Sequence, residues 1–118
     1  MGPLAASTVL AETKAMPEPK TILLVDDESH IRAFLHRYLE RMGYQVIEAE
    51  SGPVACKLLL DSATEIGLVV VDENMPKMTG TELEHWIRQQ QALRALPVLV
   101  LKGNVTNLVE AIRRSHLP

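Results

Sequence analysis

The sequence has few aromatic residues, a single cysteine and no long hydrophobic run. Aromatic residues make up only 3% of its 118 positions, so its core must be aliphatic. The lone Cys56 excludes a disulfide within the chain and is typical of a reducing compartment. No apolar run approaches the roughly 18 residues of a membrane-spanning helix, and the first residues lack the pattern of a secretory signal. We therefore expect a cytoplasmic protein.

Positive charge is also scarce. The chain carries 12 Lys and Arg against 15 Asp and Glu, a net charge of −3, without a strongly basic block. This balance argues against nucleic acid as a partner. Hydrophobic residues at 47% and charged residues at 23% are ordinary for a globular protein, and the length fits one domain. We expect no contact with membranes.

The composition changes near residue 20. Residues 1–20 are rich in alanine and small polar residues, and Pro17 and Pro19 lie near the end of this stretch. We interpret it as a flexible leader or linker and assign residues 21–118 to the domain.

Short apolar runs alternate with segments of helical periodicity. The predicted strands are 21–25, 44–49, 66–71 and 96–101, and the predicted helices are 29–43, 52–62, 81–95 and 106–116. Ser29 is the expected N-cap of the first helix, and Gly43 its stop. Short strands joined through helices are parallel, with right-handed crossovers. The sequence thus predicts an α/β fold with helices on both faces of a sheet.

Acidic residues follow two of these strands. The first strand ends in "VDDE", which places Asp26, Asp27 and Glu28 at its carboxyl end, and the third ends in "VVVDEN", with Asp72 at the same edge. If the strand order is 2-1-3-4, three carboxylates, those of Asp26, Asp27 and Asp72, converge in one crevice. Unpaired carboxylates would repel one another there, and a divalent cation such as Mg²⁺ would relieve the repulsion. A single aspartate after a strand is more often a helix cap or a loop residue than a catalytic residue, but two adjacent acidic strand ends favour a functional site.

Three segments carry a family resemblance. "ILLVDDE" at 22–28, "VVVDENMPKMTG" at 69–80 and "LPVLVL" at 96–101 resemble the receiver domain of two-component response regulators, including chemotaxis receivers. The D-x-x-M-P-x-M-x-G pattern after a buried strand is the most specific of these signals. The resemblance implies a flavodoxin-like doubly wound parallel sheet of order 2-1-3-4.

The resemblance also implies residue roles. Asp72 would be the phosphoacceptor, Asp27 a direct Mg²⁺ ligand and Asp26 a ligand acting mainly through water. Asn74 would offer its backbone carbonyl to the metal. Pro76 and Gly80 would shape the loop into the third helix.

The carboxyl-terminal part departs from the family pattern, which has Thr or Ser after strand 4 and lysine after strand 5. In one alignment Lys102 occupies the hydroxyl position, and the fifth strand and helix are missing. In the other, Lys102 is the phosphate-contacting lysine after strand 5, and an internal deletion has removed helix 4. We favour the first alignment because "LPVLVL" directly follows the third helix. The exposed edge of strand 4 would then favour a homodimer.

Two functions follow from these observations. The first is a phosphoacceptor switch, not an enzyme with an external substrate, which receives a phosphoryl group from a histidine kinase or histidine phosphotransfer protein and acts on a downstream protein target. The second is a degenerate receiver that serves as a phosphorylation-independent interaction module. A phosphatase of the haloacid dehalogenase type would need D-x-D on one strand, which "DEN" does not supply.

Overall fold

The described chain is a parallel sheet with helices on both faces. The computed structural model describes residues 21–62 and 65–103, so the predicted leader and the predicted helix at 106–116 lie outside the described residues. The strands are β1 (Thr21–Val25), β2 (Gln45–Ala49), β3 (Ile66–Asp72) and β4 (Val98–Leu101). The helices are α1 (Ser29–Arg41), α2 (Gly52–Ser62) and α3 (Gly80–Gln89), followed by the 3₁₀ turn η3 (Gln91–Leu93).

All strand pairs are parallel, in the order β2-β1-β3-β4. This confirms the predicted doubly wound sheet and its strand order. Because β4 pairs directly with β3, it occupies the place that the first alignment gave to strand 4. The predicted absence of a fifth strand and helix concerns residues after 103, which lie outside the described residues.

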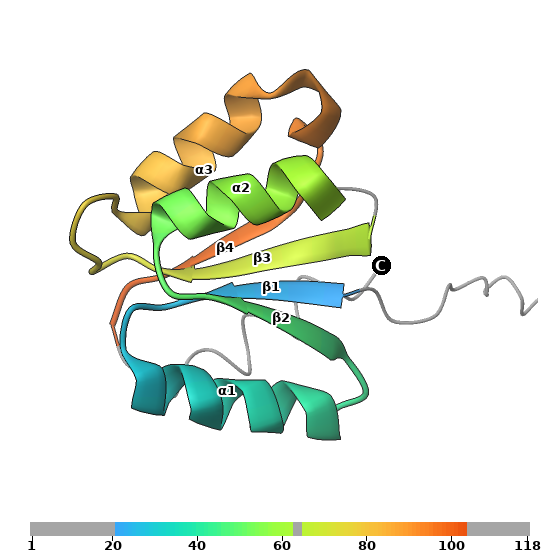
Figure 1. Ribbon diagram of the computed structural model, residues 1–118, viewed down its shortest axis with the longest axis vertical. Helices are drawn as coiled ribbons and strands as arrows, with labels where there is room; N and C mark the ends of the chain where they lie inside the picture. Colours follow the sequence, from blue (N-terminus) through green and yellow to red (C-terminus); the bar gives the residue numbers. More distant parts are fainter. Residues whose placement is uncertain (1–20, 63–64, 104–118) are drawn as a thin grey trace, which may run out of the picture.

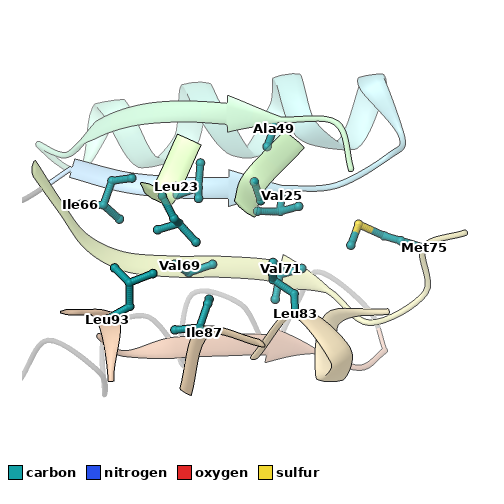
Figure 2. Close-up of a cluster of buried hydrophobic side chains, with 12 residues drawn as sticks. Leu23, Val25, Ala49, Ile66, Val69, Val71, Met75, Leu83, Ile87 and Leu93 are labelled. Carbon is teal, nitrogen blue, oxygen red and sulfur yellow. The ribbon is translucent and has the colours of Figure 1, made fainter. Parts of the chain in front are cut away.

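Two aliphatic clusters hold the helices on the sheet. Side chains of β1 and β3 alternate between the faces, as in any strand covered on both sides. Leu35 and Leu39 of α1 pack on one face against alternate residues of β1 and β3. Helices α2 and α3 cover the other face (Figure 1), where Leu83 and Ile87 join the second cluster. Figure 2 shows this cluster, to which β1 contributes Leu23 and Val25 and β3 contributes Val69 and Val71.

Helix boundaries differ from the predictions in two places. The N-cap of α1 is Glu28, not Ser29, and its side chain makes no capping hydrogen bond. The third helix ends at Gln89 rather than Ala95, because Gln90 adopts an extended conformation with ψ of 120°. Arg88 then donates to the carbonyls of Arg94 and Leu96, at 3.3 and 2.7 Å, and fixes the turn that leads into β4. Gly43 ends α1 as predicted, with a left-handed φ of 100°.

Not every apolar position of α1 faces the core. Phe34 belongs to the predicted helical periodicity but is 52% exposed, because the ridge that packs on the sheet is formed by Leu35 and Leu39.

No helix in the described ranges, residues 21–62 and 65–103, is long and apolar enough to cross a bilayer.

An ion-pair network ties α1 to β2. His36 Nδ1 lies 2.6 Å from Glu48 Oε2, and its Nε2 lies 3.1 Å from Glu40 Oε2. Burial lowers the pKa of His36, but hydrogen bonds to Glu40 and Glu48 outweigh it and raise that pKa above its ordinary value. The imidazolium form therefore stabilises the fold.

This network makes stability depend on pH. Because the pKa of His36 is raised by folding, its stabilising contribution is full below the unfolded pKa of about 6.5 and is lost as pH rises through the folded value. We expect His36→Gln to lower Tm by about 2–4 °C at pH 5.5 and much less at pH 8.5. Thermal denaturation at both pH values tests this, with the exposed His30→Gln of the same helix as control. An equal loss at the two pH values would contradict it.

Candidate functional site

The site lies where β1 and β3 end. These strands are parallel neighbours, and Val25 pairs with Val71 in register, so the residues after them, Asp26 and Asp72, lie at the same level of the sheet. Side chains alternate between the two faces along each strand, so the side chains of Asp26 and Asp72 both lie on the α1 face of the sheet. Asp27 follows on the opposite side. The register of the two strands and the aspartate that follows each of them therefore place these carboxylates side by side.

The three carboxylates lie close together. One oxygen from each of Asp26, Asp27 and Asp72 can be chosen so that all three lie within 4.8 Å of one another. Asp26 is only 5% exposed, Asp72 is half-buried and Asp27 is exposed. Among the described residues, no lysine, arginine or histidine forms an ion pair with any of them.

Burial and mutual repulsion both raise the pKa values of Asp26 and Asp72. Burial raises the pKa of Asp26, the hydrogen bond from the backbone N–H of Glu28 opposes this, and the charges of Asp72 and Asp27 raise the pKa further. Burial also raises the pKa of Asp72, against hydrogen bonds from the backbone of Asn74 and Glu73. Negative charge is thus held at this edge at a cost in stability.

The loop after Asp72 is anchored to two other elements. The N–H of Glu73 donates to the carbonyl of Leu101 in β4 at 3.0 Å. Its carboxylate accepts from the N–H and the hydroxyl of Thr81, at 2.8 and 2.7 Å, at the start of α3. These bonds, with the charge of Lys102, lower the pKa of Glu73. The residue next to Asp72 therefore joins β3, β4 and α3.

Helix α3 begins with a capping box that the sequence reasoning missed. The Thr79 hydroxyl accepts from the N–H of Glu82 at 3.1 Å, and the Glu82 carboxylate accepts from the N–H of Thr79 at 2.9 Å. The signal was present in the sequence as T-x-x-E. At Gly80 an added Cβ would lie 2.9 Å from the carbonyl oxygen of Asp72, so only glycine lets the helix start this close to the site.

Two clefts border the acidic cluster. One, of about 290 Å³, is lined by Asp27, Ser29, Arg32, Glu50, Ser51, Met75, Pro76 and Lys77. The other, of about 170 Å³, has Asp26 and Asp72 in its wall beside Ile31, Leu35 and Leu101. The carboxylates are therefore reachable from outside the sheet edge.

The remaining predicted residues lie around this cluster. Asn74 is exposed in the loop after Asp72, and the role of its carbonyl stays a prediction. Lys102 is exposed and directly follows Leu101, which pairs with Asp72 across β3 and β4. A contact between Lys102 and a phosphoryl group also stays a prediction.

Comparison with known proteins identifies the family. The family model of the response regulator receiver domain matches residues 22–115. The chain belongs to this family. The match covers both acidic strand ends, the loop after Asp72 and β4.

Individual receivers resemble the chain over most of its length. It is 30% identical to the chemotaxis protein CheY1 of Helicobacter pylori over 95 residues, 78% of this chain and 76% of CheY1. It is 37% identical to the transcriptional regulatory protein GltR of Pseudomonas aeruginosa over 85 residues, 72% of this chain and only 34% of GltR. The response regulator TrrA of Thermotoga maritima, solved in complex with Mg²⁺ and BeF, superposes with a TM-score of 0.63 at 28% identity, covering 80% of this chain and 97% of TrrA.

The donor set of this receiver suits a hard divalent cation. Three carboxylates provide oxygen ligands only, which Mg²⁺ and Ca²⁺ prefer and which Zn²⁺ sites seldom consist of. The negative charge that the three carboxylates bring together here has no cationic side chain paired with it in the described ranges, so a metal ion would neutralise it.

Removing one charge from this cluster should stabilise the metal-free receiver. In Asp26→Asn the amide oxygen can still accept from Glu28, but the buried charge and its repulsion are gone. We expect Tm at pH 7.5 in EDTA to rise by about 4–8 °C for each kcal/mol of relieved repulsion. Because the pKa of Asp26 is raised by folding, the wild type loses the penalty as pH falls, and the two proteins should converge in acid.

Calorimetry in EDTA measures both effects. Asp27→Asn, at the exposed member of the cluster, is the matched control and should change Tm less. A lower Tm for Asp26→Asn than for the wild type at pH 7.5 would contradict this account of the site.

Proposed function

We propose that Asp72 accepts a phosphoryl group from a histidine kinase or a histidine phosphotransfer protein, and that the chain acts as a signalling switch. The position of Asp72 supports this most: a half-buried carboxylate at the end of β3, with two more carboxylates within 4.8 Å. Within residues 21–62 and 65–103, no other three His, Cys, Asp or Glu side chains come this close.

The chemistry is a phosphoryl transfer between two side chains. A carboxylate oxygen of Asp72 attacks the phosphorus of an N-phosphorylated imidazole on the partner. The P–O bond forms, the P–N bond breaks, and its electron pair returns to the ring nitrogen. Such a transfer depends mainly on positioning, and the buried Val69, Val70 and Val71 hold Asp72 in place. Water later hydrolyses the acyl phosphate, so the chain is an acceptor and not an enzyme with an external substrate.

Four residues would hold the Mg²⁺ ion. Asp27 and Asp72 would bind it directly, Asp26 mainly through water, and Asn74 through its backbone carbonyl. When bound, the ion supplies neutralisation of the charge on the transferring phosphoryl oxygens. The side chain of Asp26 is buried and would keep a fixed position, whereas the exposed side chain of Asp27 could adjust to the ion.

Lys102 would contact the phosphoryl group. Its neighbour Leu101 pairs with Asp72, so Lys102 leaves β4 beside the phosphoacceptor. A lysine acts there as a point charge and cannot replace the hydrogen bond of a hydroxyl. We expect the coupling between phosphate and the segment after β4 to be electrostatic.

Phosphorylation would change the charge of the sheet edge. An acyl phosphate adds roughly one to two negative charges, which can reorder nearby loops and alter the surface offered to a downstream protein. The switch would operate in the cytoplasm. This chain would not contact nucleic acid, in agreement with its net charge of −3.

Intact mass spectrometry tests the phosphoacceptor. We expect incubation with phosphoramidate or acetyl phosphate and Mg²⁺ to add one phosphoryl group to the wild type and none to Asp72→Asn. The exposed Asp61→Asn in α2 is the matched control and should be modified like the wild type. EDTA should abolish the reaction.

The same experiment separates the switch from the interaction module. If Mg²⁺ binds but no phosphoryl group is added, the chain is a degenerate receiver that acts without phosphorylation. If the group is added to Asp72→Asn as well, the modified residue lies elsewhere and the proposal is wrong.

We also propose that two copies associate through β4. Within the described residues β4 is the last strand of the sheet, and its four residues are only half-buried. An apolar edge strand of this kind pairs readily with another chain. Sedimentation velocity over a hundredfold concentration range should show a dimer that accumulates as concentration rises. A single monomeric species throughout the range would exclude this association.

A further inference from the structure

A largely buried arginine reaches the main chain of the acidic cluster. Arg32 lies in α1, and its side chain is only 16% exposed. Its Nη1 donates a hydrogen bond of 2.6 Å to the backbone carbonyl of Asp26. Its Nε donates one of 2.7 Å to Glu48 Oε1 in β2. The guanidinium thus joins the end of β1 to β2 and α1.

The carbonyl that Arg32 binds belongs to the peptide between Asp26 and Asp27. A peptide unit is planar and rigid, so fixing the oxygen of Asp26 also fixes the N–H and the Cα of Asp27. Arg32 also lines the larger cleft beside Asp27. Its hydrogen bond therefore fixes the position of the Asp27 Cα, from which the exposed carboxylate side chain extends.

Two more polar atoms of Asp26 also form hydrogen bonds. Its N–H donates to the carbonyl of Ala49 at 3.1 Å, and its Oδ1 accepts from the N–H of Glu28 at 2.9 Å. Among the described residues, no hydrogen bond is made to its second carboxylate oxygen. Arg32 completes a set of bonds that holds Asp26 in place and leaves its second carboxylate oxygen without a hydrogen bond from the described residues.

Glu48 holds the guanidinium in this position and balances its charge. The hydrogen bond from Arg32 lowers the pKa of Glu48, with His36 adding to the effect, so this carboxylate stays ionised at neutral pH. Two charge-assisted bonds in a fork geometry make the arginine rigid. A cation beside a metal site would ordinarily weaken metal binding, but here its charge is paired.

We propose that Arg32 is a positioning residue for the metal site, which raises Mg²⁺ affinity by fixing the Asp26–Asp27 peptide. The inference rests on the proposed function, since it takes the three aspartates as the Mg²⁺ ligands. It goes beyond that function because Arg32 lies outside the acidic cluster and acts through the main chain. Groups that orient metal ligands in this way typically change metal affinity by about 10–100-fold when they are replaced.

Charge and position predict opposite results for Arg32→Met. If Arg32 acted only by its charge, removing a cation beside the site would strengthen Mg²⁺ binding. If Arg32 positions the peptide, its removal weakens binding. We expect Mg²⁺ affinity, measured by isothermal titration calorimetry well below Tm, to fall about tenfold or more in Arg32→Met. Arg37→Met removes an exposed arginine from the same helix and should stay within about twofold of the wild type.

A melting curve of each variant separates positioning from general stability. A merely structural role would lower Tm and leave the Mg²⁺ affinity of the folded protein unchanged, and that result would overturn the inference. If Arg32→Met does not fold, Arg32→Lys decides, because it retains the charge without the two-pronged geometry: weaker binding supports positioning, and unchanged binding overturns it. Wild-type protein that binds no Mg²⁺ would refute the metal site itself, and the inference with it. Wild-type binding with unchanged or tighter binding in Arg32→Met would refute only the role of Arg32.

Discussion

Three carboxylates forced together at one sheet edge are the constraint on which the rest of the site depends. The parallel register of β1 and β3 leaves no choice, because Val25 and Val71 are paired and an aspartate follows each of them. The repulsion is a property of the fold, and it persists as long as the two strands remain neighbours. A sequence under selection for stability alone would have little reason to keep it.

The surrounding structure supplies the rigidity that such a cluster requires. Strand β3 is buried along nearly its whole length, so Asp72 cannot move without disturbing the core. The Glu73–Thr81 bonds and the capping box of α3 anchor the loop beyond it. Gly80 allows α3 to approach the carbonyl of Asp72 closely. Secondary structure on both sides of the loop thus limits how far a phosphoryl group or ion could displace it.

The features that the sequence predicted are those set by local pattern. Continuous apolar runs identified β1 and β3, the strand order placed Asp26 and Asp72 at one edge, and Gly43 marked the end of α1. The bonds from Arg32 and Glu73 could not be predicted, because each joins elements whose relative position depends on packing. The early end of α3 was missed for a similar reason: Gln90 is a fair helix former that takes an extended conformation where the chain turns toward β4.

The pairing of Arg32 with Glu48 explains how a cationic side chain can lie beside a predicted cation site. An unpaired guanidinium there would attract the carboxylates and compete with a metal ion for them. With its charge balanced at 2.7 Å by Glu48, the guanidinium contributes mainly a directed hydrogen bond to the Asp26 carbonyl. The attraction that remains at the sheet edge is then that of the three aspartates. Through this network α1 and β2 can fix the main chain of the site without neutralising the negative charge of the three aspartates.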